Sequence, residues 1–345
     1  MKICFATHDG VTIAKGGVYV KIIEFKKYYE SRGIDVELFN IWDSVDRLKE
    51  FDLVHLLPAN IAVYSLARNL NFNNIKFVVE PVFFSNHSSN FLKTVSSIDK
   101  IARKFAKGVW FDYGFIRDIC NWSELVLPNT ESEADRISKG FGISQSKIKV
   151  IHNGVSERFL NGDPDLFRKK YGLDKFILNV GHIGPYRKNM LRFVKAVKNI
   201  DCPTVIIGKV SDAGETNEVM KEAEKNSNIH FISDIPNDSP LLASAYAACD
   251  TFVLPSLFET PGIAALEAAL GGAKIVITKY GGTKDYFEDY ADYVDPYSIE
   301  NIKTVIESSL NKSKTSSTMD YIKNNFLWEK VAEKTLQTYQ SLIGK

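Results

Sequence analysis

The hydrophobic and polar positions of the chain follow two alternating patterns from one end to the other. Short apolar runs predict strands over residues 2–7, 35–40, 53–57, 75–80, 124–129, 147–152, 176–181, 204–208, 228–233, 251–256 and 274–279. Amphipathic stretches lie between these runs. In the stretch at 17–33, one face of the expected helix is apolar and consists of Val18, Ile22, Phe25 and Tyr29. Gly33 is the expected end of that helix. Strands that alternate with helices predict parallel sheets covered on both faces.

The alternation runs through two series, which predicts two doubly wound domains of similar size. The polar, Gly- and Pro-containing residues 161–172 are the expected join between them. Ligands of such sheets bind beyond the carboxyl ends of the strands, and the cleft between two domains is the expected site.

Composition excludes several classes of protein but does not indicate a function. A 345-residue chain with 45% apolar residues, 25% charged residues and a net charge of +1 indicates a globular protein without a nucleic-acid partner. The four cysteines are widely spaced, so neither zinc nor disulfides are expected, and a reducing cytosol is the natural setting. The sequence contains neither a signal-peptide pattern nor an apolar run long enough for a membrane span.

Residues 258–271 read FETPGIAALEAALG and hold two glutamates, Glu259 and Glu267. Thr260 is the expected cap of the following helix and Pro261 its first residue, while Gly262 allows close backbone approach. A helix that starts at the carboxyl end of a strand is a ready phosphate site.

Glu267 lies within this helix among alanines and leucines, so burial would leave its carboxylate in need of hydroxyl or amide donors. A ribose diol supplies two such donors; the alternative is a structural glutamate satisfied by a neighbouring loop. The pair also has a spacing compatible with the acid and base of a glycosidase. A neutral glycosidase substrate has no use for the adjoining phosphate-type helix start, which disfavours that interpretation.

Three loops are further candidates for binding an anion. Arg187 and Lys188 fall near a predicted helix start, where cations are unfavourable unless an anion joins them, so they predict a phosphate clamp rather than a solvated basic turn. Gly16 and Gly17 form a Gly-rich turn that matches neither a dinucleotide fingerprint nor a P-loop, and a plain turn is its alternative. Gly282 lies in another Gly-rich loop, after the strand at 274–279.

Residues 98–115 combine an apolar face with basic and aromatic residues. This pattern fits contact with an anionic membrane surface, and the alternative is a core-packed helix with a solvated face. The Asp163-Pro-Asp165 stretch looks like a metal pair, but a surface turn in the join is the better interpretation.

The segment S-x-F-E-x-P-G-I-x-x-L-E-A at 256–268 resembles the Glu-x(7)-Glu motif of the retaining glycosyltransferases of family 4. The resemblance extends over nearly the whole chain, through KIKVIHNGV, VGHIGPYRKN, GGTKD and FLWEKVAEKTLQTYQSL. It implies an α/β fold of the GT-B type, with two Rossmann-like domains facing across a cleft. Residues 1–160 would form the acceptor-side domain and 161–327 the donor-side domain, and the helix in 328–345 would cross back onto the first domain.

The resemblance also implies roles for individual residues. Glu259 would bind hydroxyls of the donor sugar, Glu267 the nucleotide ribose, and Lys188 the diphosphate. Other residues that it places at the donor are Gly16, Gly17, His182, Pro261, Gly262, Ile263 and Gly282.

The chain departs from the family pattern at two places. His182 stands where the family has an arginine, and Arg187 is the expected replacement for its charge. Val82 or Phe83 stands where the family often has a histidine near the donor sugar, and His87 follows as a weaker substitute.

The implied activity is metal-independent transfer of a hexose, with retention, from a UDP- or GDP-linked sugar to a hydroxyl of a glycan or lipid-linked acceptor. No cofactor is implied, and the setting is the cytoplasm, at the inner face of the membrane where residues 98–115 make contact. Two rivals remain open. One is another enzyme of this fold, such as a sugar-nucleotide epimerase or a phosphorylase. The other is a non-catalytic partner subunit, which the missing arginine and histidine motivate.

Overall fold

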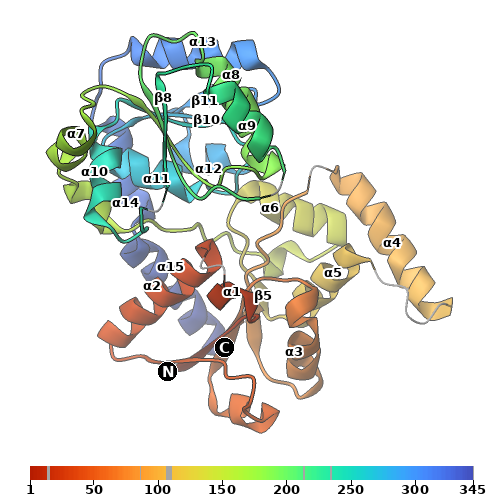
Figure 1. Ribbon diagram of the computed structural model, residues 1–345. Coiled ribbons are helices and arrows are strands. Elements are labelled where there is room, and N and C mark those ends of the chain that lie inside the picture. Colours follow the sequence, from red (N-terminus) through yellow and green to blue (C-terminus); the bar gives the residue numbers. More distant parts are fainter. Residues whose placement is uncertain (14–15, 86, 106–110, 213, 234, 345) are drawn as a thin grey trace. The chain divides into compact units, whose positions relative to one another are not determined.

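The computed structural model describes residues 1–13, 16–85, 87–105, 111–212, 214–233 and 235–344 (Figure 1). It divides into two compact units. Unit 1 comprises Met1–Gly154 and Trp328–Lys345, and unit 2 comprises Val155–Leu327. Each unit is built on one parallel sheet with helices on both faces, so the predicted fold class is confirmed.

Unit 1 holds a five-stranded sheet in the order β2-β1-β3-β4-β5. Its strands are β1 (Lys2–Ala6), β2 (Asp35–Leu38), β3 (Leu53–Leu56), β4 (Phe77–Val79) and β5 (Leu125–Val126). Its helices are α1 (Gly10–Ile13), α2 (Gly17–Ser31), α3 (Ile61–Phe72), α4 (Ser89–Phe105), α5 (Asp112–Trp122), α6 (Glu131–Asp135) and α15 (Trp328–Ile343), with short helical turns η1 (Val45–Glu50), η2 (Arg136–Gly140) and η3 (Gln145–Lys147). The strand predicted at 147–152 is wrong, because this segment makes only a single bridge, from Ile148 to Val126.

Alternation along the strands of unit 1 divides its buried residues between two faces. Cys4, Val54 and Val79 pack with the helices α3 and α5 on one face. Ile3, Phe5 and Val78 pack on the other face with α2 and α15. The helix α2 buries Ile22, Phe25 and Tyr29 of its predicted face and ends at Ser31, with Arg32 as its C-cap and Gly33 following at φ +73°.

The helix α15 lies beside α2 within unit 1 (Figure 1). The Tyr29 hydroxyl donates to the Ala332 carbonyl at 3.2 Å, and Trp328 stands edge-on to Phe25. The predicted return of the C-terminal helix to the N-terminal half of the chain is therefore confirmed.

Unit 2 holds a six-stranded sheet in the order β11-β10-β9-β6-β7-β8. Its strands are β6 (Ile177–Val180), β7 (Thr204–Ile207), β8 (Ile229–Ile232), β9 (Thr251–Leu254), β10 (Lys274–Thr278) and β11 (Asp292–Val294). Its helices are α7 (Pro164–Tyr171), α8 (Met190–Val197), α9 (Thr216–Ala223), α10 (Pro240–Ala248), α11 (Ile263–Leu270), α12 (Thr283–Phe287), α13 (Ile299–Leu310) and α14 (Ser317–Phe326), with turns η4 (Glu157–Asn161) and η5 (Tyr186–Lys188).

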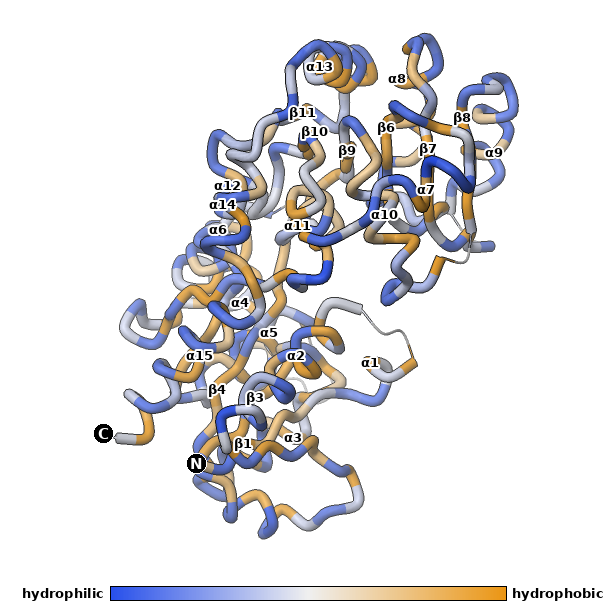
Figure 2. The backbone as a smooth tube through the Cα atoms, turned by 90° about the vertical axis from the view of Figure 1, so that its left-hand side faces the viewer, coloured by the Kyte–Doolittle hydropathy of each residue, from blue (hydrophilic) through white to orange (hydrophobic). Residues whose placement is uncertain are grey.

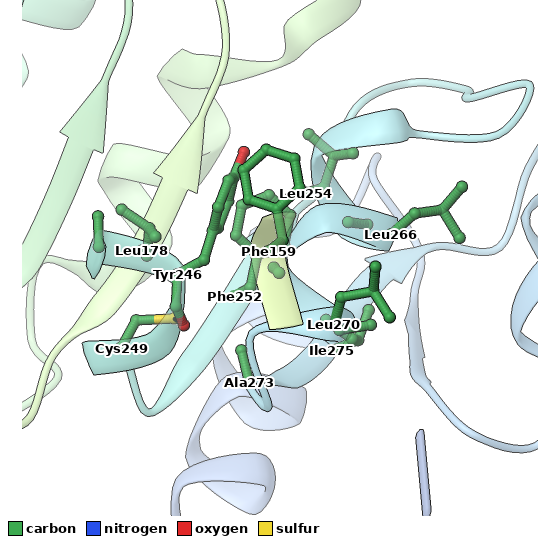
Figure 3. Packing of buried hydrophobic residues seen from close by; sticks show 14 of the residues in the cluster. Phe159, Leu178, Tyr246, Cys249, Phe252, Leu254, Leu266, Leu270, Ala273 and Ile275 are labelled. Atoms are coloured by element: carbon green, nitrogen blue, oxygen red, sulfur yellow. Dashed lines mark hydrogen bonds between the residues drawn. The ribbon is translucent and has the colours of Figure 1, made fainter. Parts of the chain in front are cut away.

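The same alternation gives unit 2 two cores. Ile177, Val253 and Val276 face the helices α8, α9 and α13. The neighbouring strand positions face α7, α10, α11 and α14, in the core that Figure 3 shows around Phe252 and Tyr246. Figure 2 shows both hydrophobic and hydrophilic residues on α13, whose buried side packs on the sheet.

The predicted join at residues 161–172 is wrong. Most of this stretch forms the helix α7, which Asp163 caps by accepting from the amide of Asp165 at 3.0 Å. Phe159 and Phe167 belong to the core of unit 2, so their burial holds the segment inside that unit. The two units meet in sequence between Gly154 and Val155.

Candidate functional site

The candidate residues of unit 2 gather where the strand order of its sheet reverses. The chain runs outward from β6 through β7 to β8, returns to β9 beside β6, and continues outward through β10. The loops that follow β6 and β9 therefore leave adjacent strands at the switch point, where doubly wound sheets bind ligands. The loop after β6 carries Arg187 and Lys188, and the loop after β9 carries Glu259.

Glu259 forms the centre of this site. Its Oε1 lies 2.7 Å from the Lys188 Nζ and its Oε2 lies 3.2 Å from the Arg187 guanidinium. The glutamate is only 6% exposed. Burial acts to raise the pKa of Glu259, but the charges of Lys188 and Arg187 outweigh it and hold the pKa below its ordinary value. The carboxylate is thus ionised at neutral pH, and the three side chains together carry one net positive charge.

The ion pairs with Glu259 change the interpretation of Arg187 and Lys188, which were expected to need an anionic ligand. The cations near the helix start do have an anionic partner, and that partner is Glu259 itself. The excess positive charge of the trio still favours an anionic ligand.

Backbone hydrogen bonds hold the three loops together. The Leu257 amide donates to the Arg187 carbonyl at 2.9 Å, which links the loops after β9 and β6. The amide of Glu259 donates to the Tyr280 carbonyl at 3.2 Å. Its carbonyl accepts from the amide of Gly282 at 2.8 Å, which links the loops after β9 and β10. Gly281, at φ +97°, lies so close that an added Cβ would stand 1.9 Å from the Glu259 carbonyl oxygen.

Asn189 connects the loop after β6 to two other loops through buried hydrogen bonds. It is 1% exposed and adopts φ +57°, and its side-chain amide donates to the carbonyls of Pro255 and Pro296 at 2.8 and 2.7 Å. This residue was missed from the sequence, although an asparagine tolerates the left-handed conformation better than most residues and follows the basic pair directly.

The helix α11 starts later than predicted. Thr260 and Pro261 precede it, and Gly262 occupies the cap position at φ +78° with no side-chain cap. The turn is tight, because a Cβ at Gly262 would lie 3.0 Å from the Leu254 side chain and 3.2 Å from Ile277. Only glycine suits both the conformation and the space. The amides of Ile263 and Ala264 come before the first hydrogen bonds of α11, which the amides of Ala265 and Leu266 make to the Gly262 carbonyl at 2.8 and 3.3 Å, so these two amides can face an anion.

Glu267 is buried on α11, as predicted, at 7% exposure. Its Oε2 accepts a hydrogen bond from the Tyr246 hydroxyl on α10 at 2.7 Å. Burial raises the pKa of Glu267 to about 7, against the lowering influence of Tyr246, Arg158 and Asn237. One donor to the Glu267 carboxyl group is therefore Tyr246, a side chain of the neighbouring helix α10. From the sequence, only a ligand or a neighbouring loop was expected to supply such donors.

Of the remaining predicted residues, one lies in unit 2 and two lie in unit 1. His182 follows β6 and is exposed, and no described contact joins it to Glu259. Gly16 and Gly17 belong to unit 1, where both are exposed and Gly16 precedes the first turn of α2.

The segment after β4 in unit 1 is firmly held. Both carboxylate oxygens of Glu133 accept backbone amides, from Phe83 at 2.6 Å and from Asn129 at 2.7 Å. Val82 adopts φ +52°, which is strained for a β-branched residue, and is 41% exposed. His87 stacks on Phe91, with ring centroids 4.2 Å apart.

Residues 98–115 divide between two helices. The helix α4 ends at Phe105, residues 106–110 lie outside the described part, and α5 starts at Asp112. On α4, Ile98, Ile101 and Phe105 are 51%, 59% and 86% exposed, so the core-packed interpretation is wrong for these residues. In the described part of the chain, no helix has both the length and the apolar character to cross a membrane.

A Rossmann-like sheet with a cationic pair and a helix start at its switch point is typical of proteins that bind phosphorylated ligands. Sequence comparison narrows this class. Residues 165–326 match the model of glycosyl transferases group 1, and residues 5–159 match that of glycosyltransferase family 4. Together the two models span nearly the whole chain, which belongs to the family 4 (group 1) glycosyltransferases.

Individual relatives are distant. An uncharacterized glycosyltransferase of Methanocaldococcus jannaschii is 24% identical over 237 residues, which cover 62% of this chain and 59% of the relative. The D-inositol 3-phosphate glycosyltransferase of Paenarthrobacter aurescens is 27% identical over 256 residues, covering 66% and 59%. The chain thus matches less than two thirds of the length of these relatives.

Solved structures resemble the fold over the full chain. HepE of Anabaena in complex with UDP has a TM-score of 0.73 at 18% identity and covers 99% of this chain, which covers 100% of HepE. Sucrose-phosphate synthase from Thermosynechococcus elongatus has a TM-score of 0.75 at 15% identity, with both chains fully covered.

Proposed function

We propose that the protein is a retaining glycosyltransferase that moves a hexose-type sugar from a UDP- or GDP-linked donor to a hydroxyl group. The observation that carries this proposal is the Arg187–Lys188–Glu259 cluster at the switch point of unit 2, beside the start of α11. The UDP and UDP-glucose complexes of the structurally similar HepE support a nucleotide-sugar donor.

In the proposed reaction, Lys188 and Arg187 bind the diphosphate and Glu259 binds hydroxyls of the sugar. The bond between the anomeric carbon and the diphosphate oxygen breaks while the acceptor oxygen bonds to the same face of that carbon. The two cations and the amides at Gly262 and Ile263 stabilise the charge that develops on the departing diphosphate. The acceptor proton passes to a diphosphate oxygen. Glu259, ion-paired and ionised, has no proton to give, so the mechanism assigns it to binding.

Neither a metal nor a cofactor takes part in this proposal. The described residues contain no group of three or more His, Cys, Asp or Glu side chains arranged to hold a metal ion. The measurement is transfer with and without EDTA: unchanged rates support the proposal, and a loss that Mg²⁺ or Mn²⁺ restores contradicts it.

The acceptor is proposed to be a glycan or a lipid-linked oligosaccharide at the cytoplasmic face of a membrane. The support is α4, whose exposed Ile98, Ile101 and Phe105 accompany the exposed Lys100 and Lys104. Exposed apolar side chains next to cations fit an anionic lipid surface. Sedimentation with phosphatidylglycerol vesicles tests the contact, with phosphatidylcholine vesicles as the control. Equal binding to both, or to neither, contradicts it.

The activity is tested with a panel of nucleotide sugars, scored by thermal stabilisation and by release of nucleotide. Glu267→Ala is expected to weaken nucleotide affinity and to reduce transfer strongly, and wild-type transfer in that variant would contradict the ribose role. Binding without turnover would indicate a non-catalytic subunit. An isomerised sugar nucleotide with no acceptor consumed would indicate an epimerase.

A further inference from the structure

One contact in unit 2 joins a fully buried tyrosine to the glutamate that the proposed function assigns to the ribose. The Tyr246 hydroxyl donates to the Glu267 Oε2 at 2.7 Å. Tyr246 is 0% exposed and lies on α10, while Glu267 lies on α11. Burial raises the pKa of Tyr246 well above its ordinary value, so the hydroxyl keeps its proton and remains a donor.

The packing fixes the direction of this hydroxyl. The Tyr246 ring meets Phe159 edge-on at 5.5 Å between centroids and Phe252 at 5.8 Å. Figure 3 shows the ring enclosed by this core, with its hydroxyl oxygen at the end remote from Cys249. Gly271, which ends α11, brings the two helices close, because a Cβ there would lie 3.0 Å from the Tyr246 backbone. The ring therefore has little freedom to turn away from Glu267.

The hydroxyl acts on both the orientation and the charge of Glu267. With Oε2 held by Tyr246, Oε1 is the oxygen that faces a ligand hydroxyl, and the Asn237 side chain is also hydrogen-bonded to this carboxyl group. Burial disfavours the carboxylate, and the tyrosine hydroxyl favours it. Among the described residues, the other group with a charge that acts on Glu267 is Arg158 of η4, which is bonded to the Asn237 carbonyl and side-chain oxygens at 2.7 and 2.8 Å.

We propose that Tyr246 is the positioning residue of the nucleotide site: its hydroxyl orients Glu267, so that the carboxylate accepts the ribose hydroxyls of a nucleoside diphosphate. The inference rests on the proposed function and adds to it a residue outside the Glu-x(7)-Glu segment. It predicts that nucleotide affinity depends on pH through Glu267 and that Tyr246 sets the position of this dependence.

The test is the affinity of the full-length protein for UDP and for GDP, measured by calorimetry from pH 6 to pH 9, in the wild type and in Tyr246→Phe. The variant keeps the ring and loses only the hydroxyl. We expect affinity to fall by roughly tenfold at pH 7, the size expected for a hydrogen bond to a charged group. The difference in affinity between the variant and the wild type should become smaller towards pH 9. Loss of the hydroxyl raises the pKa of Glu267, so the midpoint of the pH dependence moves to higher pH in the variant. Tyr293→Phe is the matched control, since it removes a hydroxyl that donates to the Glu288 carbonyl at 2.7 Å, and its affinity should equal that of the wild type.

A second pair of variants separates positioning from packing. Adding Tyr246→Phe to Glu267→Gln should produce little further loss of affinity, because the hydroxyl acts through the carboxylate. Equal losses in both backgrounds would overturn the inference, as would wild-type affinity in Tyr246→Phe at every pH. Should Tyr246→Phe fail to fold, the wild type alone decides, since UDP affinity that stays flat from pH 6 to pH 9 contradicts the inference. Failure of the proposed function looks different: the wild type then binds no nucleoside diphosphate at any pH.

Discussion

Replacing Glu267 with glutamine should change the pH dependence of stability in a calculable way. The pKa of Glu267 is raised from 4.5 to about 7, so the folded protein holds a proton that the unfolded chain releases. A carboxyl group with a raised pKa destabilises the fold progressively as pH rises from the unfolded to the folded value. The penalty is about 1 kcal/mol at pH 5 and about 3 kcal/mol at pH 8, at 1.36 kcal/mol per pKa unit.

Glutamine has nearly the same shape but does not ionise, so Glu267→Gln removes this penalty. The free energy of unfolding of the variant, relative to the wild type, should therefore rise by about 2 kcal/mol between pH 5 and pH 8. Any constant effect of the amide on hydrogen bonding cancels in this comparison. The measurement is urea unfolding of both proteins at four pH values in the absence of nucleotide. Parallel stability curves would refute the burial argument.

Three further substitutions probe the loops around Glu259. Gly281→Ala should lower the free energy of unfolding by more than about 2 kcal/mol and abolish UDP binding, because its Cβ would collide with the Glu259 carbonyl oxygen at φ +97°; wild-type behaviour would contradict the tight packing of this loop. Lys188→Met leaves the Glu259 carboxylate to Arg187 alone and should cost about 3 kcal/mol at pH 7 but less at pH 4. The sign follows from the lowered pKa of Glu259, whose contribution to stability is present above the unfolded pKa and disappears as pH falls; a loss independent of pH in urea unfolding would refute it. Asn189→Ala removes two buried hydrogen bonds at a left-handed position and should cost about 2–4 kcal/mol by thermal unfolding; a cost below about 0.5 kcal/mol would show that the loops do not depend on it.

The fold was largely predictable because strand and helix periods are local. Ile177 and Leu178 both read as apolar, and the period of two that sends them to opposite cores needs no knowledge of distant contacts. The segment at 161–172 failed because its polar composition is shared by linkers and by surface helices. Only the long-range burial of Phe167 decides between the two.

The site was predictable as far as sequence neighbours define it. Glu259, Arg187 and Lys188 were named from their loops. The ion pair between Lys188 and Glu259, however, spans 71 residues, so their contact could be predicted only once the strand order was known. Tyr246 was missed because nothing marks a tyrosine in AYAACD as the partner of a glutamate on the next helix. The start of α11 was misplaced because Thr260 and Pro261 satisfy the local rules for a cap, whereas the tight turn needs the conformation of Gly262.

Unit 1 is assembled from two stretches of chain, and unit 2 lies entirely between them in the sequence. During synthesis, unit 2 has all of its residues once Leu327 has left the ribosome, whereas the core of unit 1 still lacks α15. Phe25 and Tyr29 already pack on Phe5, but the side of α2 that they share with α15 is then uncovered, because their contacts with Trp328, Ala332 and Tyr339 are still missing. The order of completion is thus reversed relative to the usual N-terminal-first order. A ribosome that stalls after residue 327 but before residues 328–343 are complete would carry a complete unit 2 and an incomplete unit 1. Chaperones could then bind the side of α2 that α15 has not yet covered.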